Sequence, residues 1–115
     1  QDTERTVERF HGLIAKGHRD PRQIMRQLRH HPHVKDTDRW LPWLDALATD
    51  SLHGLSLPGD TRITLLQGGR DAIVPPAQAH FIRGLCPTMR YELMESAGHA
   101  PHLEDPAHFA SLLAA

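Results

Sequence analysis

Apolar residues recur at helical spacing along the first half of the chain. Val7, Phe10 and Ile14 lie three or four positions apart, and Gly17 is typical of the left-handed residue that ends a helix. We therefore expect a helix from Thr3 to Lys16. The same pattern places Leu13 on the apolar side of this helix.

Two shorter helices are predicted next. Asp20 and Pro21 form an N-cap and first-turn pair for a helix that stops before Pro32. The third helix follows capping candidates at Asp36–Asp38 and must hold Pro42 in its first turn. The apolar positions of the two helices are Ile24, Met25 and Leu28, and then Trp40, Leu41, Leu44, Leu47 and Ala48.

The pattern changes after the turn-forming run Leu57–Asp60. Ile63–Leu66 is a short apolar run ended by two glycines, which is typical of a buried parallel strand. A helix opens at Pro75–Pro76, and a second strand near a sheet edge alternates Met89, Tyr91 and Leu93 with polar residues. Asp105 and Pro106 cap a terminal helix whose predicted apolar face holds Phe109, Leu112 and Leu113.

This order predicts an α/β protein with helical residues 1–57 followed by a strand-helix-strand-helix unit over residues 58–115. Two parallel strands cannot cover both faces and edges of their own sheet. We therefore expect part of a larger fold, completed by a missing amino-terminal half, by another chain or by exchange of elements between copies. The chain begins at Gln1 without an initiator Met, which also suggests missing upstream residues.

Composition limits the class of protein only loosely. The chain has 115 residues, a formal net charge of −1 and no apolar run near the roughly 20 residues that span a bilayer. The lone Cys86 cannot form an internal disulfide and fits a reducing compartment. We expect a cytoplasmic protein that binds neither nucleic acid nor membrane.

Two candidate catalytic residues follow the two predicted strands. Asp71 comes just after the first strand and His99 just after the second, 28 positions later. Because parallel strands end at the same edge of a sheet, we expect these side chains to meet there. A histidine that acts as a general base needs a carboxylate on its other ring nitrogen. The alternative is a turn-forming Asp71 and an ordinary loop histidine.

Both loops resemble the acid and base loops of serine α/β-hydrolases. The carrying motifs are Gly-x-x-Asp-x-Ile-Val-Pro around Asp71 and Gly-His-Ala-Pro-His-Leu-Glu-Asp-Pro around His99. In that fold the nucleophile precedes the acid and base and lies in a G-x-S-x-G elbow. No such elbow surrounds Cys86 or any of the four serines, Ser51, Ser56, Ser96 and Ser111. The resemblance thus implies the C-terminal part of an α/β-hydrolase fold, inactive alone, in which His102 and Glu104 are structural.

The predicted helices carry arginines on their surfaces. Arg22, Arg26 and Arg29 are spaced by four and three, so they share a helix face, which is turned away from Ile24, Met25 and Leu28. Arg5 and Arg9 form a similar pair. Guanidinium groups favour an acidic or phosphate-bearing partner. The alternative is a solvated helix face.

The whole chain resembles the pimeloyl-carrier-protein methyl ester esterase family of biotin synthesis, in which a helical lid precedes the last strands. The resemblance implies that Arg5, Arg9, Arg22 and Arg26 bind an acidic acyl carrier protein bearing a pimeloyl methyl ester. It also implies no cofactor. The substrate-binding residues that it implies are Phe10, His11, Gly12, Leu13, Ile14 and His99.

Three other interpretations stay open at this stage. The complete protein could be a less specific carboxylesterase or another lidded hydrolase, with Phe10 an ordinary core residue. The chain could also be a non-catalytic binding module that needs a partner chain. Finally, His30-His31-Pro32-His33 could bind a transition metal, but Pro32 interrupts the helical spacing and no cysteine or carboxylate cluster accompanies the run, so we expect no metal site.

Overall fold

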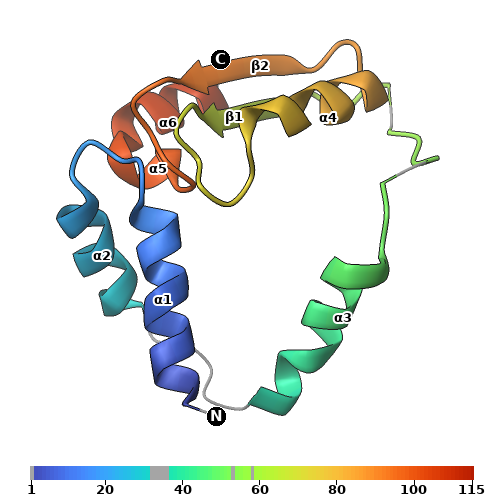
Figure 1. Ribbon diagram of the computed structural model, residues 1–115. Helices are drawn as coiled ribbons and strands as arrows, with labels where there is room; N and C mark the ends of the chain where they lie inside the picture. The colour runs from blue at the N-terminus through green and yellow to red at the C-terminus, as the bar shows by residue number, and fades with distance from the viewer. Residues whose placement is uncertain (1, 32–36, 53, 58) are drawn as a thin grey trace.

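The computed structural model describes residues 2–31, 37–52, 54–57 and 59–115. Three helices extend from an α/β unit (Figure 1), and the chain measures 43 × 33 × 24 Å along its principal axes. Pro58, at the predicted boundary between the two parts, lies outside the described residues, as does the capping candidate Asp36. Within the described residues, no helix is both long and apolar enough to cross a membrane.

The first two helices pack against each other as an antiparallel pair (Figure 1). Helix α1 spans Thr3–Ala15, and Gly17 follows it with a φ of 89°, the left-handed conformation that its position predicted. Helix α2 spans Pro21–His30, and the Asp20 side chain accepts a hydrogen bond from Gln23 N at 3.1 Å. The local capping residues therefore correctly predicted where both helices occur in the sequence.

Helix α3 diverges from α1, to which it lies nearest where each helix begins (Figure 1). It spans Leu41–Thr49 with Pro42 in its first turn, as predicted, and a short 3₁₀ helix at Thr37–Arg39 precedes it. Trp43 and Leu47 are 76% and 82% exposed, so α3 buries little of its apolar surface within this chain.

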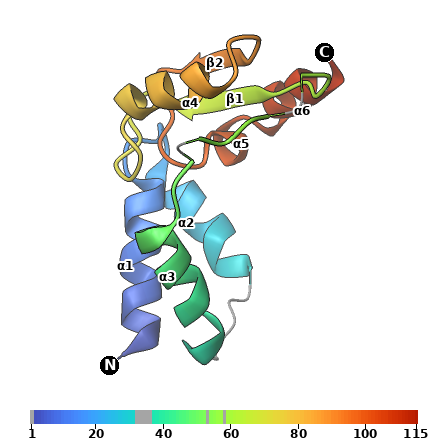
Figure 2. The same ribbon diagram turned by 90° about the vertical axis from the view of Figure 1, so that its right-hand side faces the viewer.

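The α/β unit contains two parallel strands. Strand β1 spans Thr64–Gly68 and strand β2 spans Arg90–Met94. The 3₁₀ helix Pro76–Gln78 leads into α4, Ala79–Leu85, on one face of the sheet. Helices α5, Pro101–Glu104, and α6, Pro106–Ala114, cover the opposite face (Figure 2). The predicted order of strand, helix, strand and helix is confirmed, with α5 as an addition.

The core is built largely from small residues. Its fully buried large side chain is Ile24, and the other buried apolar residues are Ala15, Ala79, Ala97, Ala100 and Leu112. One burial prediction is wrong, because Leu113 is 70% exposed and Leu112 takes the inward position on α6. In β1, Gln67 and Gly68 are buried and the apolar Leu65 and Leu66 are half-buried. The strand pairs with β2 along one edge in the described residues, whereas a fully buried parallel strand has neighbours along both.

Candidate active site

The acid loop begins where β1 ends. Gln67 is buried, and its Nε2 donates hydrogen bonds to the carbonyl oxygens of Gly68 at 3.0 Å and Val74 at 3.2 Å. Asp71 Oδ1 accepts the backbone N–H groups of Ile73 at 2.8 Å and Val74 at 2.9 Å. One carboxylate oxygen therefore shapes the loop, which leaves Oδ2 to face the base.

The base loop follows β2 and is bonded directly to the acid loop. Gly69 N donates to Met94 O at 2.8 Å, and Arg70 N donates to Ala97 O at 2.9 Å. These two bonds continue the pairing of β1 with β2 beyond the last strand residues. The loops that carry Asp71 and His99 are consequently held side by side at the carboxyl edge of the sheet.

Asp71 and His99 meet at this edge, as the spacing predicted. Asp71 Oδ2 lies 2.9 Å from His99 Nδ1. Because an ionised carboxylate can only accept, Nδ1 carries the proton and Nε2 keeps its lone pair. The Asp71 side chain is 6% exposed and that of His99 is 33% exposed, so the imidazole reaches the surface while the carboxylate does not. In the described residues, His99 Nε2 has no hydrogen-bond partner.

The environment of Asp71 favours its charged form. Burial is the largest single influence and raises the pKa of the carboxyl. The hydrogen bonds from Val74 N–H, His99 and Ile73 N–H together outweigh it, and the pKa of Asp71 lies below its ordinary value of 3.8. The Asp71 carboxylate is therefore ionised at neutral pH.

This lowered pKa predicts an acid-sensitive contribution to stability. A carboxyl whose pKa is lower in the folded state stabilises the fold above its unfolded pKa and loses that contribution as the pH falls through the folded pKa. The urea midpoint of the chain, compared with that of Asp71→Asn from about pH 6 to about pH 2, should show an advantage that shrinks on acidification. An advantage that stays constant would contradict the ionised hydrogen-bonded carboxylate.

The predicted substrate-binding residues divide into two groups. Phe10 and His11 line an apolar cavity of about 450 Å³ between α1 and α3. The other four, which do not line it, are Gly12, Leu13, Ile14 and His99. His11 Nδ1 is buried without a hydrogen-bond partner among the described residues. The remaining lining residues are Thr6, Val7, Trp40, Leu44 and Leu47.

The four predicted carrier-binding arginines are all exposed. Arg22 and Arg26 line a groove of about 380 Å³ on α2, together with Met25, which the sequence had placed on the opposite side of the helix. Arg5 and Arg9 lie in the first two turns of α1. Arg29, by contrast, is paired with Glu8 of α1. In the described part of the chain, none of the first four forms an ion pair.

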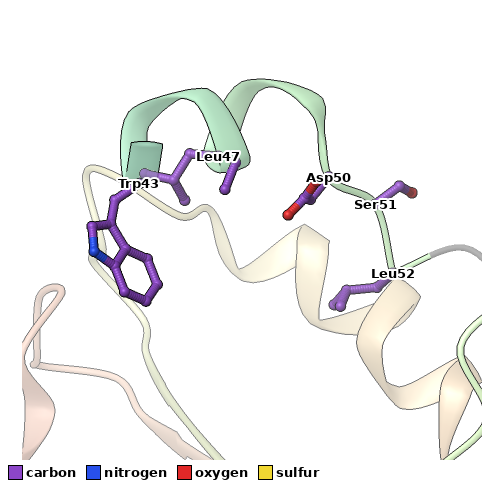
Figure 3. A pocket seen from close by; sticks show the side chains of 6 residues that line it. Trp43, Leu47, Asp50, Ser51 and Leu52 are labelled. Atoms are coloured by element: carbon purple, nitrogen blue, oxygen red, sulfur yellow. The ribbon is translucent and has the colours of Figure 1, made fainter. Parts of the chain in front are cut away.

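In the described residues, the neighbours of Ser51, Ser96 and Ser111 are residues other than His99. Ser51 lines a cavity of about 310 Å³ on α3, where its hydroxyl points away from the Asp50 carboxylate (Figure 3). The described lining residues there include no histidine. Ser96 donates to Glu104, and Ser111 donates to the carbonyl of His108. Cys86 contacts Thr88.

The metal alternative falls partly outside the described residues, because Pro32 and His33 are not among them. In residues 2–31, 37–52, 54–57 and 59–115, no three His, Cys, Asp or Glu side chains lie together as a metal site. The expectation of no metal therefore stays a prediction.

Two residues of the site escaped sequence analysis. Gln67 had a local signal, since it is a polar residue at the end of an apolar strand. His18 had none beyond its place after a helix-ending glycine, although its ring is buried and bonded to Glu104 and to the base loop. Glu104, expected to be structural, is bonded to His18 and accepts the backbone N–H of Arg19.

The chain thus has a partial α/β fold, in which helices cover both faces of two parallel strands. A hydrogen-bonded aspartate–histidine pair lies at the carboxyl edge of these strands. No protein-family model matches the chain. It is 31% identical over 97% of its length to the pimeloyl-[acyl-carrier protein] methyl ester esterase of Aeromonas hydrophila. It is 30% identical, over the same share, to the biotin biosynthesis bifunctional protein BioHC of Teredinibacter turnerae.

The chain is thus a relative of the pimeloyl-[acyl-carrier protein] methyl ester esterases, and the resemblance in its sequence is confirmed. A shorter match, 38% identical over 46% of the chain, is to the esterase of the same name from Neisseria meningitidis. The chain spans 45% of the Aeromonas hydrophila esterase and 20% of the bifunctional protein.

Proposed function

We propose that this chain supplies the acid and base of a Ser-Asp-His ester hydrolase whose nucleophile lies in another segment of the complete protein. The observation that carries the proposal is the 2.9 Å bond from His99 Nδ1–H to Asp71, with Nε2 unpartnered and the ring partly exposed. Such a histidine can accept a proton from an incoming hydroxyl group. In this proposal residues 1–57 form the lid and residues 58–115 form the end of the hydrolase core.

The reaction would proceed in two half-reactions. The serine hydroxyl attacks the ester carbonyl as His99 Nε2 takes its proton, and the resulting imidazolium is stabilised by Asp71. His99 then returns the proton to the departing alkoxide, which leaves as the alcohol. Water attacks the acyl-enzyme in the same way, with His99 as base, and releases the acid and the free serine. Donors to the oxyanion also come from the rest of the protein.

The proposed substrate is the methyl ester of a pimeloyl group carried on acyl carrier protein. The similarity to pimeloyl-[acyl-carrier protein] methyl ester esterases supports it, because those enzymes are named for this substrate. The exposed arginines of α1 and α2 offer charge complementary to an acidic carrier protein. The apolar cavity beside Phe10 and His11 is suited to a methylene chain. The products would be pimeloyl carrier protein and methanol.

A charge-reversal experiment separates this carrier esterase from a less specific carboxylesterase. In the product of the complete reading frame, we expect Arg22→Glu with Arg26→Glu to raise KM for the carrier-linked ester by about tenfold at low salt. Hydrolysis of a small p-nitrophenyl ester should be unchanged, because the two arginines are not part of the Asp71–His99 pair. Steady-state kinetics with both substrates measure the two effects.

The matched control is Arg62→Glu with Arg83→Glu, which makes the same change in net charge on the α/β unit instead of on α1 and α2. His99→Ala should abolish both activities, and the isolated 115-residue chain should be inactive. If the α2 double variant hydrolyses the carrier-linked ester normally while His99→Ala is inactive, the carrier-specific function is wrong and a general carboxylesterase remains. Ester hydrolysis by the pure chain that depends on His99 would overturn the placement of the nucleophile elsewhere.

A further inference from the structure

The turn between α1 and α2 lies against both catalytic loops. Gly17 faces the backbone of Arg70, where an added Cβ would overlap Arg70 O and lie 2.7 Å from Arg70 Cβ. On the other side, a Cβ on Gly98 would overlap Lys16 O and lie 2.7 Å from His18 Cδ2. Residues 70 and 98 directly precede Asp71 and His99. The turn therefore touches the acid loop and the base loop at the residues next to the catalytic pair.

His18 is the polar centre of this contact. The residue is 5% exposed and its side chain is fully buried. Its Nε2 accepts the backbone N–H of Ala100 at 3.1 Å, and its Nδ1 lies 3.3 Å from Glu104 Oε1. Because a backbone N–H can only donate, Nε2 is unprotonated and the ring proton sits on Nδ1, which donates to Glu104. His18 is thus a neutral bridge from the lid turn to the residue after His99.

Glu104 fixes the other end of the bridge. Its Oε1 also accepts the backbone N–H of Arg19 at 2.8 Å, and its Oε2 accepts the Ser96 hydroxyl at 3.3 Å. Arg19 Nη2 reaches the same hydroxyl at 3.4 Å. Helix α5, the α1–α2 turn and the start of the base loop are therefore bonded through one carboxylate. In Figure 1 the α1–α2 turn lies beside α5.

We propose that His18 is a positioning residue, which sets the place of His99 by holding the Ala100 N–H and thereby locks the lid turn onto the base loop. It touches neither member of the catalytic pair. Without the Nε2 acceptor, the buried Ala100 N–H would lose its partner, and the backbone beside His99 would shift to find another. The kinetic part of this proposal rests on the proposed esterase function, whereas its spectroscopic part does not.

Two conservative substitutions separate the two bonds of the ring. In Asn the terminal amide atoms lie as many bonds from Cβ as Nδ1 does in histidine, and in Gln they lie as far as Nε2. His18→Asn can therefore still donate to Glu104 but has no acceptor for Ala100, whereas His18→Gln can accept from Ala100 and loses the donor to Glu104. His80 is an exposed histidine on α4, and His80→Asn controls for the loss of an imidazole.

The spectroscopic test uses ¹⁵N-labelled product of the complete reading frame. We expect the wild type to show His18 as the Nδ1–H tautomer and His99 with a downfield Nδ1 proton, bonded to Asp71. His18→Asn should broaden or shift the His99 proton signal, and His18→Gln should restore it. An Nε2–H tautomer for His18, or a His99 signal indifferent to His18→Asn in a folded protein, would overturn the proposal.

The kinetic test distinguishes positioning from general support of the fold. His18→Asn should lower kcat by about tenfold or more with less than about a twofold change in KM, because small displacements of a catalytic group are costly. His18→Gln and His80→Asn should stay close to wild type. Equal losses in His18→Asn and His18→Gln would refute the role of the Ala100 bond. If the wild type hydrolyses no ester, the proposed function fails, and the tautomer and the His99 signal still decide the role of His18.

Discussion

Replacing Asp71 with Asn should lower kcat for ester hydrolysis by about 10³- to 10⁴-fold in the complete protein. The substitution keeps the shape of the acid loop, because an amide oxygen can still accept the N–H groups of Ile73 and Val74. The amide nitrogen, however, then faces His99 Nδ1 and can only donate. The ring must shift its proton to Nε2, where it can no longer act as a base. Electrostatic support for the imidazolium disappears as well.

A second aspartate offers a matched control for this experiment. Asp105 caps α6 by accepting His108 N–H at 2.9 Å, so it has the same type of backbone role as Asp71 without a catalytic partner. Asp105→Asn should retain the cap and nearly full activity. Single-turnover measurements of acyl transfer, made together with KM, would locate the defect of Asp71→Asn in the chemical step. A kcat for Asp71→Asn within about tenfold of wild type would remove Asp71 from the triad.

Local signals in the sequence were sufficient to place most elements. Asp20, Asp105 and Gly17 each act within a few residues of the helix end that they mark. The meeting of Asp71 with His99 also followed from sequence, because parallel strands leave only one edge at which both loops can lie. The prediction succeeded where one geometric rule determined the result.

Long-range side-chain contacts could not be predicted in this way. His18 and Glu104 are 86 positions apart, and no periodicity in either segment indicates that they meet. Phe10 and Trp40 line one cavity because α1 and the start of α3 approach each other there. No local pattern in either helix predicts that approach. Leu112 rather than Leu113 is the buried residue of α6. Which of two neighbouring leucines faces inward depends on the rotation of the helix about its axis, and the sequence pattern does not determine that rotation.

Close backbone packing, rather than a large apolar core, holds the acid loop and the base loop together. Ala97 and Ala100 are buried beside β1, and Gly68 and Gly69 let the two loops approach at backbone distance. Glycine is required at Gly68 by space alone, since its φ is not in the left-handed region. Gly68 and Gly69, which the sequence pattern indicated only as the end of a strand, therefore allow Asp71 to reach His99.

Gly68→Ala should therefore destabilise the chain by about 3 kcal/mol or more, near the upper end for an overpacked site. An added Cβ would overlap Gly98 O and lie 2.7 Å from Ala97 O and 2.8 Å from Gly98 C. These are backbone atoms, so no side-chain rotation can relieve the contact, and the base loop would have to move away from the acid loop. Urea denaturation followed by circular dichroism measures the loss.

Gly84→Ala is the matched control, since it adds the same methyl group within α4, where no atom lies within 4 Å of the new Cβ. It should stabilise the chain by about 0.5 kcal/mol, because alanine loses less conformational freedom in a helix than glycine. Opposite signs for the two substitutions would attribute the loss at Gly68 to the contact with Gly98 rather than to a general cost of added volume. A neutral Gly68→Ala would mean that the two loops can separate freely, and His99 could not then be held against Asp71 by the backbone that joins them.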